Sequence, residues 1–197
     1  MARKLQIGIC VLAGGLSRRM QRDKARLRLG RRTLLGHVRA LARSLGCPVR
    51  IIRRDLVPRC GPLGGILTAL STSRADAELF LACDMPFVSP KLLAEVIARF
   101  EVRRRALFVV EGGRPGFPFL LPRGAQKTVL DQIDQELFSL RALAERLRAS
   151  RLRPSPAQAR GLFNVNTPAD WEEARARWRA ARFLEKPRRA KNCKTRL

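Results

Sequence analysis

The sequence predicts an α/β fold in which a mostly parallel sheet carries helices on both faces. Short apolar segments of strand length alternate with segments of helical periodicity, and glycine, proline and polar residues separate them. The 197 residues, 46% of them hydrophobic, are enough to bury one core. Strands that alternate with helices imply parallel βαβ crossovers, and such sheets bind ligands beyond the carboxyl ends of their strands.

The first half of the chain shows this alternation clearly. Residues 5–12 form an apolar run that ends at two glycines, as a buried parallel strand does. Apolar residues then recur at helical spacing over residues 34–45, with Thr33 as the candidate N-cap and Gly46 as the stop. Residues 49–52 are the second strand. A loop with proline and glycine follows, and a helix is expected over residues 66–71.

The middle of the chain continues the pattern. Residues 78–83 form the third strand, and Ser89 followed by Pro90 is a strong start for a helix over residues 91–100. Residues 106–110 form another strand, with a glycine turn after it. A return strand over residues 117–121 is expected to pair antiparallel at the edge of the sheet.

The last third is predicted to be mainly helical. Helices are expected over residues 128–133, 139–147 and 168–183, and Pro154 and Pro156 mark a loop before the last of them. Thr167 or Asn166 is the expected cap of that last helix, whose first turns contain Asp170, Glu172 and Glu173.

Composition excludes several classes of function. The chain has 41 Lys and Arg against 16 Asp and Glu, a formal charge of +25. The basic residues are scattered rather than clustered, so nucleic acid is not the expected partner, although the field steers phosphorylated substrates toward the protein. No apolar run approaches the roughly 20 residues that cross a bilayer, and no secretory signal is evident. A cytoplasmic protein without membrane contact is therefore expected.

Cysteine and histidine usage narrows the chemistry further. The five cysteines are widely spaced, with no C-x-x-C pair, and are interpreted as buried free thiols. His37 is the only histidine, which excludes most zinc sites and the usual Ser-His or Cys-His nucleophile pairs. Carboxylates, lysine, arginine, backbone amides or a metal ion must supply the chemistry.

Polar or glycine-rich segments follow each of the first three strands. The loop of residues 12–24 has two adjacent glycines with serine, arginine and lysine nearby, which suits a phosphate, although a solvated turn is equally open. Asp55 precedes G-P-L-G-G-I, where glycines let a base or ribose approach main chain, or simply form a tight turn. Asp84, in C-D-M-P, is placed as a magnesium ligand or as a helix or loop cap.

Four motifs in order resemble those of the molybdenum cofactor guanylyltransferases: L-A-G-G-x-S-x-R-M with D-K-A, G-P-L-G-G-I, A-C-D-M-P-F and F-N-V-N-T-P-A-D. The resemblance spans residues 7 to about 176. It implies a three-layer, Rossmann-like nucleotidyltransferase fold over residues 1–185, and residues 186–197 are expected to be a disordered basic tail. It also implies transfer of GMP from GTP to the molybdopterin cofactor with release of pyrophosphate. Molybdoenzymes or cofactor-handling proteins are the implied protein partners.

The resemblance assigns roles to individual residues. The nucleotide would be held by Leu12, Ala13, Gly14 and Gly15, and Asp55 would contact the nucleoside. The catalytic residues would be Arg19, Lys24 and Asp84. Arg19 and Lys24 would face the triphosphate, and Asp84 would bind Mg²⁺ and the phosphates of GTP. Substrate-binding residues on the pterin side would be Gly116, Phe119, Asn164 and Asn166.

The choice of nucleotide depends on two motifs. L-A-G-G and G-P-L-G-G-I favour guanine, because cytidylyl-transferring relatives typically have L-A-A-G and lack the second motif. Gln21 replaces the usual glycine after R-M, and the segment before Gly61 is short, with Arg53 and Arg54 near the place of a nucleotide-contacting asparagine. Two alternatives stay open: a cytidylyl- or other nucleotidyltransferase of the same fold, and a basic non-catalytic protein that binds RNA or molybdoenzymes.

Overall fold

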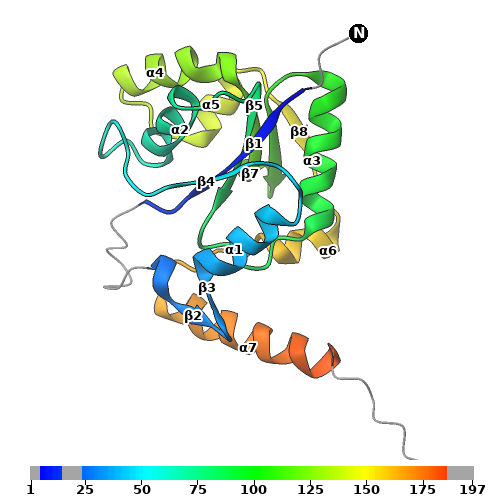
Figure 1. Ribbon diagram of the computed structural model, residues 1–197. Helices are drawn as coiled ribbons and strands as arrows, with labels where there is room; N and C mark the ends of the chain where they lie inside the picture. The colour runs from blue at the N-terminus through cyan, green and yellow to red at the C-terminus, as the bar shows by residue number, and fades with distance from the viewer. Residues whose placement is uncertain (1–4, 15–23, 186–197) are drawn as a thin grey trace, which may run out of the picture.

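A computed structural model of the chain describes residues 5–14 and 24–185, with side chains up to residue 181. Its centre is a six-stranded sheet in the order β4-β1-β5-β7-β6-β8 (Figure 1). The strands are β1 (Ile7–Leu12), β4 (Val49–Ile52), β5 (Ala77–Ala82), β6 (Leu107–Glu111), β7 (Arg114–Pro122) and β8 (Ser150–Leu152). The pairs β1/β4, β1/β5 and β6/β8 are parallel, and β7 alone runs against the other five strands. The predicted α/β fold with a mostly parallel sheet is confirmed.

The position of β7 corrects the prediction made from the sequence. The return strand is antiparallel, as expected, but it lies between β5 and β6 rather than at the edge. Phe119, Leu120 and Leu121 are fully buried there, because the cores on the two faces of the sheet cover their side chains. The edge of the sheet next to β6 is formed by β8, a strand of three residues that the hydrophobic pattern does not reveal, and β4 forms the other edge.

Helices cover both faces of the sheet and complete three layers. One face packs against α1 (Leu34–Arg43) and α3 (Pro90–Arg103) through a core that contains Ile7, Ile9 and Val11 of β1. The other face packs against α2 (Pro62–Ser71), α4 (Gln126–Asp134) and α5 (Leu140–Arg146), which lie together on one side of the sheet in Figure 1. Successive side chains along each strand point to opposite faces of the sheet and therefore contribute to two separate cores.

Several helix starts match the sequence signals, and two do not. The side chains of Thr33, Ser89 and Ser139 each accept a hydrogen bond from the backbone N–H three residues further along the chain. All three residues are therefore N-caps of their helices. Helix α2, however, begins four residues before the expected Ile66, with Pro62 in its first turn. A short helix, α6 (Pro156–Ala159), replaces the expected loop, because Ser155 and Gln158 form a reciprocal capping box.

A third, smaller core lies beneath the sheet. The hairpin of β2 (Arg28–Leu29) and β3 (Arg32–Thr33) packs with α7 (Pro168–Glu185), which runs along the bottom of Figure 1. His37 belongs to this region: its Nε2 lies 2.7 Å from the Leu29 carbonyl oxygen, and its ring meets the edge of Trp178. The single histidine therefore has a structural environment and lies apart from the cavity described below.

Two further expectations concern thiols and membranes. No disulfide links the cysteines within the described part of the chain; Cys10 and Cys60 are buried, whereas Cys47 and Cys83 are only partly buried. Within the same residues, no helix is long and apolar enough to cross a bilayer. The expected tail, residues 186–197, lies outside the described residues.

Candidate functional site

A cavity of about 370 Å³ opens at the carboxyl ends of β1, β4 and β5. Segments from five regions of the chain meet there: the end of β1 with its loop, the loop after β4 with the start of α2, the turn after β5, strand β7, and the residues before α7. The lining residues are Leu12, Gly14, Ile52, Asp55, Gly61, Pro62, Gly65, Ala82, Cys83, Asp84, Phe117, Asn164 and Asn166. The cavity lies where a parallel sheet is expected to bind its ligand.

A lysine, a carboxylate and a carboxamide meet at one end of this cavity. Lys24, in the 3-10 turn η1 (Lys24–Arg26), places its Nζ 2.7 Å from Oδ1 of Asn166 and 3.8 Å from Oδ2 of Asp84. The backbone N–H of Val165 donates to the Asp84 carbonyl oxygen at 2.9 Å, so the chain before α7 is tied to the turn after β5. Three segments distant in sequence thus converge on the Lys24 ammonium group.

The carboxylates of the cavity are poised to attract cations. Burial raises the pKa of Asp84, and attraction to Lys24 opposes this shift only in part. Burial also raises the pKa of Asp55, a partly buried carboxyl that lines the same cavity. An added positive charge would relieve the desolvation of both groups.

Glycines allow the walls around Asp55 to approach one another closely. A Cβ at Gly14 would lie 3.2 Å from the Arg53 carbonyl oxygen and 3.5 Å from Oδ1 of Asp55. A Cβ at Gly65 would lie 3.2 Å from the Leu12 side chain and 3.3 Å from the same carboxyl oxygen. The absence of side chains at these two positions therefore shapes the wall of the cavity.

At position 64 a glycine is needed for a different reason, which is contact with the protein's own backbone. A Cβ there would lie 2.4 Å from the Val57 carbonyl oxygen, a backbone atom that cannot move aside cheaply. The sequence placed Gly64 in a turn pressed against a ligand, but it lies inside α2 and packs against the protein's own loop. The neighbouring Gly65 does line the cavity.

Several expected site residues share this cavity, and others do not. Leu12, Gly14, Asp55, Asp84, Asn164 and Asn166 line it together, and Lys24 contacts two of them. Ala13 is not a lining residue, and its N–H donates to the Ile52 carbonyl oxygen at 2.8 Å. Gly15 and Arg19 lie outside the described residues, as does Gln21.

Gly116 and Phe119 also do not line the cavity. Phe119 is fully buried, with its ring stacked 5.0 Å from Phe80 and 4.6 Å from Phe108. Phe117 lines the cavity in its place. The register between β6 and β7 shifts at this point, so simple alternation along the strand could not identify which phenylalanine reaches the cavity.

Two features of the site were missed by the sequence reading. The sequence does not predict that Asn166 accepts a hydrogen bond from Lys24, whose ammonium group also lies 3.8 Å from Asp84. Gly61 and Pro62 line the cavity because α2 starts early. Proline directly after glycine was the available signal for that start, since proline is favoured in the first turn of a helix.

The oxygen atoms around the cavity suit a hard divalent cation. Asp55 and Asp84 supply carboxylates, and Asn164 adds a carboxamide. Among the described residues no cluster of three or more His, Cys, Asp and Glu exists that could form an all-protein metal site. Mg²⁺ does not require one, because it commonly uses one or two carboxylates together with phosphates and water.

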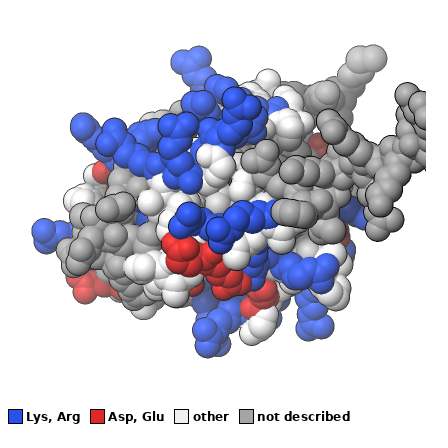
Figure 2. Space-filling view, turned by 90° about the horizontal axis from the view of Figure 1, so that it is seen from below, with Lys and Arg blue, Asp and Glu red and all other residues white. Residues whose placement is uncertain are grey.

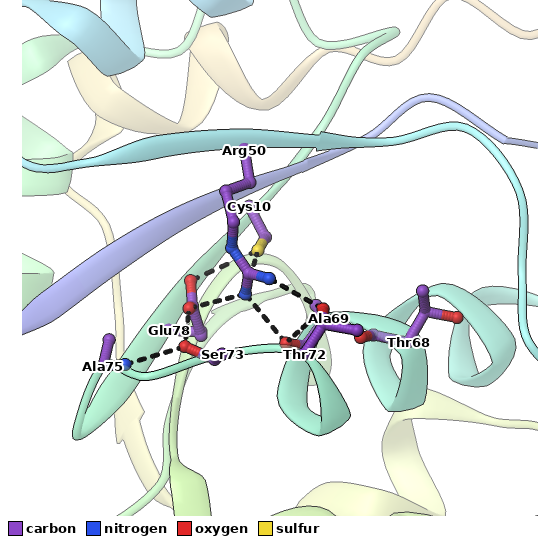
Figure 3. Close-up of polar contacts among 8 residues, drawn as sticks. All are labelled: Cys10, Arg50, Thr68, Ala69, Thr72, Ser73, Ala75 and Glu78. Atoms are coloured by element: carbon purple, nitrogen blue, oxygen red, sulfur yellow. Dashed lines mark hydrogen bonds and ion pairs between the residues drawn. The ribbon is translucent and has the colours of Figure 1, made fainter.

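A second cavity, of about 820 Å³, lies at the opposite end of the strands. Two of its charged lining residues, Arg50 and Glu78, form an ion pair with each other. The buried Glu78 pairs with Arg50 at 2.8 Å and accepts from the Cys10 thiol and the Ser73 hydroxyl (Figure 3). Arg50 also donates to Thr72 and to the carbonyl oxygen of Ala69. This buried network ties β1, β4 and β5 to the end of α2.

Comparison with known proteins identifies the family of the chain and several relatives. The family model of the MobA-like NTP transferase domain matches residues 9–152. A probable molybdenum cofactor guanylyltransferase of Pelotomaculum thermopropionicum is 30% identical over an alignment that covers 87% of this chain and 93% of that protein. A molybdenum cofactor guanylyltransferase of Xanthomonas euvesicatoria is 32% identical, with 82% and 90% covered.

Solved structures share the fold. Molybdopterin-guanine dinucleotide biosynthesis protein A from Archaeoglobus fulgidus superposes with a TM-score of 0.72 at 22% identity, covering 88% of this chain and 99% of that one. A 2-C-methyl-D-erythritol 4-phosphate cytidylyltransferase from Thermus thermophilus gives 0.67 at 16% identity, with 89% and 100% covered. The fold alone therefore does not select the base. By the family model and by its relatives, the chain belongs to the MobA-like NTP transferases and is a nucleotidyltransferase.

Proposed function

We propose that the protein transfers GMP from GTP to the molybdopterin cofactor, forming the guanine dinucleotide cofactor and releasing pyrophosphate. The observation that carries this proposal is the meeting of Gly14, Asp55 and Asp84 in one cavity, with Lys24 bound at its edge. Relatives similar over most of their length are named molybdenum cofactor guanylyltransferases, which supports the choice of substrates.

The nucleoside of GTP is proposed to lie against Leu12, Gly14 and Gly65, with Asp55 at its polar edge. The glycines leave main chain accessible there, and Asp55 is a hydrogen-bond acceptor in a partly desolvated place. A partly buried acceptor favours a base that presents N–H donors, and guanine presents them at its N1 and N2 positions. Gly15 and Arg19 are proposed to complete the nucleotide site, as the family motif implies.

Lys24 and Asp84 are proposed to act on the phosphates. An oxygen of the acceptor phosphate attacks the α-phosphorus of GTP, a new P–O bond forms, and the α–β bond breaks to release pyrophosphate. The acceptor phosphate is already ionised near neutral pH, so the protein needs no base and contributes mainly alignment and charge neutralisation. Lys24 supplies a fixed positive charge. Asp84 would hold Mg²⁺, which when bound neutralises charge on the phosphate oxygens.

The acceptor is proposed to enter past Asn164, an exposed residue of the cavity wall, and Phe117. The net charge of +25 favours the approach of an acceptor that carries phosphate. Cytoplasmic location and delivery of the product to molybdoenzymes or cofactor-handling proteins remain part of this proposal.

The direct test compares GTP, CTP, ATP and UTP as donors with molybdopterin cofactor and Mg²⁺, measuring pyrophosphate and the dinucleotide product. We expect product with GTP and little with the other three. Preference for CTP would identify a cytidylyltransferase, a reaction that the shared fold also accommodates. Absence of pyrophosphate with all four donors, together with salt-sensitive retention on a polyanion column, would favour a non-catalytic binding protein.

A further inference from the structure

We infer that Asp170, in the first turn of α7, is a positioning residue that sets Lys24 through Asn166. Asp170 neither lines the cavity nor contacts Lys24 by a hydrogen bond. The position of Asp170 in the first turn of α7 indicates by itself only a role in capping that helix. The hydrogen bonds around it connect this cap to the ammonium group that the proposed function places at the triphosphate.

The first step is the contact between Asp170 and the chain before it. One carboxylate oxygen, Oδ2, accepts hydrogen bonds from the backbone N–H groups of Asn166 and Thr167, both at 2.8 Å. The side chain of Thr167 in turn accepts from the Asp170 N–H at 3.2 Å. The exchange between Thr167 and Asp170 is a capping box, whereas the bond to Asn166 extends beyond it.

The second step runs from Asn166 to the cavity. Because Asp170 holds its N–H, the backbone of Asn166 is fixed just before the helix, and its side chain reaches Lys24 at 2.7 Å. The Lys24 ammonium group donates a hydrogen bond to Asn166 at 2.7 Å, whereas the Asp84 carboxylate lies 3.8 Å from it, beyond hydrogen-bond distance. The position of the ammonium group therefore depends on the position of Asn166.

The third step is electrostatic. The N–H groups of Asn166 and Thr167 lower the pKa of Asp170, so its carboxylate is ionised and accepts both bonds at neutral pH. Residues of this kind, which orient a functional side chain without touching substrate, typically change activity about 10- to 100-fold when removed.

The capping box provides a matched control. Asp170→Ala removes the cap and the bond to Asn166, whereas Thr167→Ala removes a hydrogen bond of the cap and leaves Asp170 free to hold Asn166. Asp170→Asn retains an oxygen that can accept from both N–H groups. A role limited to helix capping predicts similar effects for the two alanine variants, because each removes a cap contact.

The first readout needs no substrate. Lys24 and the exposed Lys127 are acetylated with a trace of acetic anhydride, and mass spectrometry gives their relative rates. We expect Asp170→Ala to raise the relative rate at Lys24 by about 2- to 10-fold, the change that loss of one hydrogen bond allows. Thr167→Ala and Asp170→Asn should match the wild type. Equal rates in the two alanine variants would overturn the inference, whatever the reaction catalysed.

The second readout is turnover, and it alone rests on the proposed function. With GTP, kcat/KM should fall about 10- to 100-fold in Asp170→Ala and remain within about threefold of wild type in Thr167→Ala and Asp170→Asn. Adding Asp170→Ala to Asn166→Ala should cause little further loss, because both act through one contact. Full additivity would contradict the inference. A labelling difference without guanylyl transfer by the wild type would retain the positioning role and reject the proposed function.

Discussion

The Lys24–Asp84 pair shows how the site balances its charges. The two side chains are largely buried and 3.8 Å apart, yet burial still raises the pKa of Asp84. The lysine therefore does not fully compensate the desolvation of the carboxylate. The Asp84 carboxylate can therefore still attract a further cation. A carboxylate that holds Mg²⁺ next to phosphates needs this property.

Replacing Asp84 by Asn should separate activity from stability. A carboxyl whose pKa is raised on folding stabilises the fold while protonated, and this contribution is lost as the pH rises through its folded-state pKa. At neutral pH the ionised Asp84 therefore costs stability, and the neutral amide removes that cost. We expect turnover to fall about 100-fold or more, while calorimetry gives an unchanged or higher Tm at pH 7.

The same variant has a pH signature. As the pH is lowered toward the ordinary Asp value of 3.8, wild-type Asp84 becomes neutral and the difference in Tm should narrow. A large loss of Tm at pH 7 would instead assign Asp84 a structural role.

Lys24→Ala should mainly affect the handling of the triphosphate. Removing a fixed positive charge next to phosphate typically costs about 100-fold in kcat/KM. The Tm at pH 7 should also fall, because Asp84 keeps its buried charge and loses the lysine that partly compensates it. Steady-state kinetics with GTP measures the effect. Lys127→Ala, at an exposed site on α4, is the control. Equal kinetics for the two variants would remove Lys24 from the site.

The sequence identifies residues of the site when they directly follow strands. Gly14, Asp55 and Asp84 could be found in this way, because parallel strands bring their carboxyl ends together. The contact between Lys24 and Asn166 spans 142 residues, and no local pattern predicts it. The sequence does not single out Phe117, because the register shift in β7 breaks the alternation that would distinguish it from Phe119.

At the scale of elements, caps were easier to predict than the helix that begins in a glycine-rich segment. Thr33 and Ser89 are recognisable because their hydroxyls replace a missing backbone partner. Helix α2 was placed too late, since Gly64 and Gly65 look like a loop by intrinsic preference. Packing decides otherwise, because the glycines let the first turn of α2 lie against the loop after β4.

Gly64→Ala should therefore destabilise the protein although alanine favours helices. Its Cβ would overlap the Val57 carbonyl oxygen, and overpacking of this kind costs about 1–3 kcal/mol. Gly124→Ala is the matched control, because no atom lies within 4 Å of the added carbon. Urea unfolding compares the two. A Gly64→Ala variant as stable as wild type would show that the loop after β4 yields readily.

At the scale of the whole molecule, the direction of the strands determines where the site forms. Five of the six strands run the same way, so loops after β1, β4 and β5 open on one edge. The sequence predicts this arrangement because strands and helices alternate. The sequence does not predict the order of β7, β6 and β8. Strand β8 has only three residues and is recognised only by its pairing with β6.

The charge of the whole molecule should affect encounter with substrate. Lys and Arg side chains recur across the face in Figure 2, around a group of acidic side chains near its centre, and the net charge is +25. We expect kcat/KM for GTP to fall about tenfold between about 0.05 and about 0.5 M salt, because the field that attracts the triphosphate is screened. Stopped-flow binding measures the association rate. A rate independent of salt would exclude long-range steering.

The central claim is that one cavity, formed by Gly14, Asp55 and Asp84 with Lys24 beside it, holds a purine triphosphate with a divalent cation. Isothermal titration calorimetry of the protein with GTP and Mg²⁺ tests it most directly. The account predicts saturable binding at one site, weaker with CTP and strongly reduced in Asp84→Asn. Absence of binding by the wild type, or equal binding by wild type and Asp84→Asn, would contradict it.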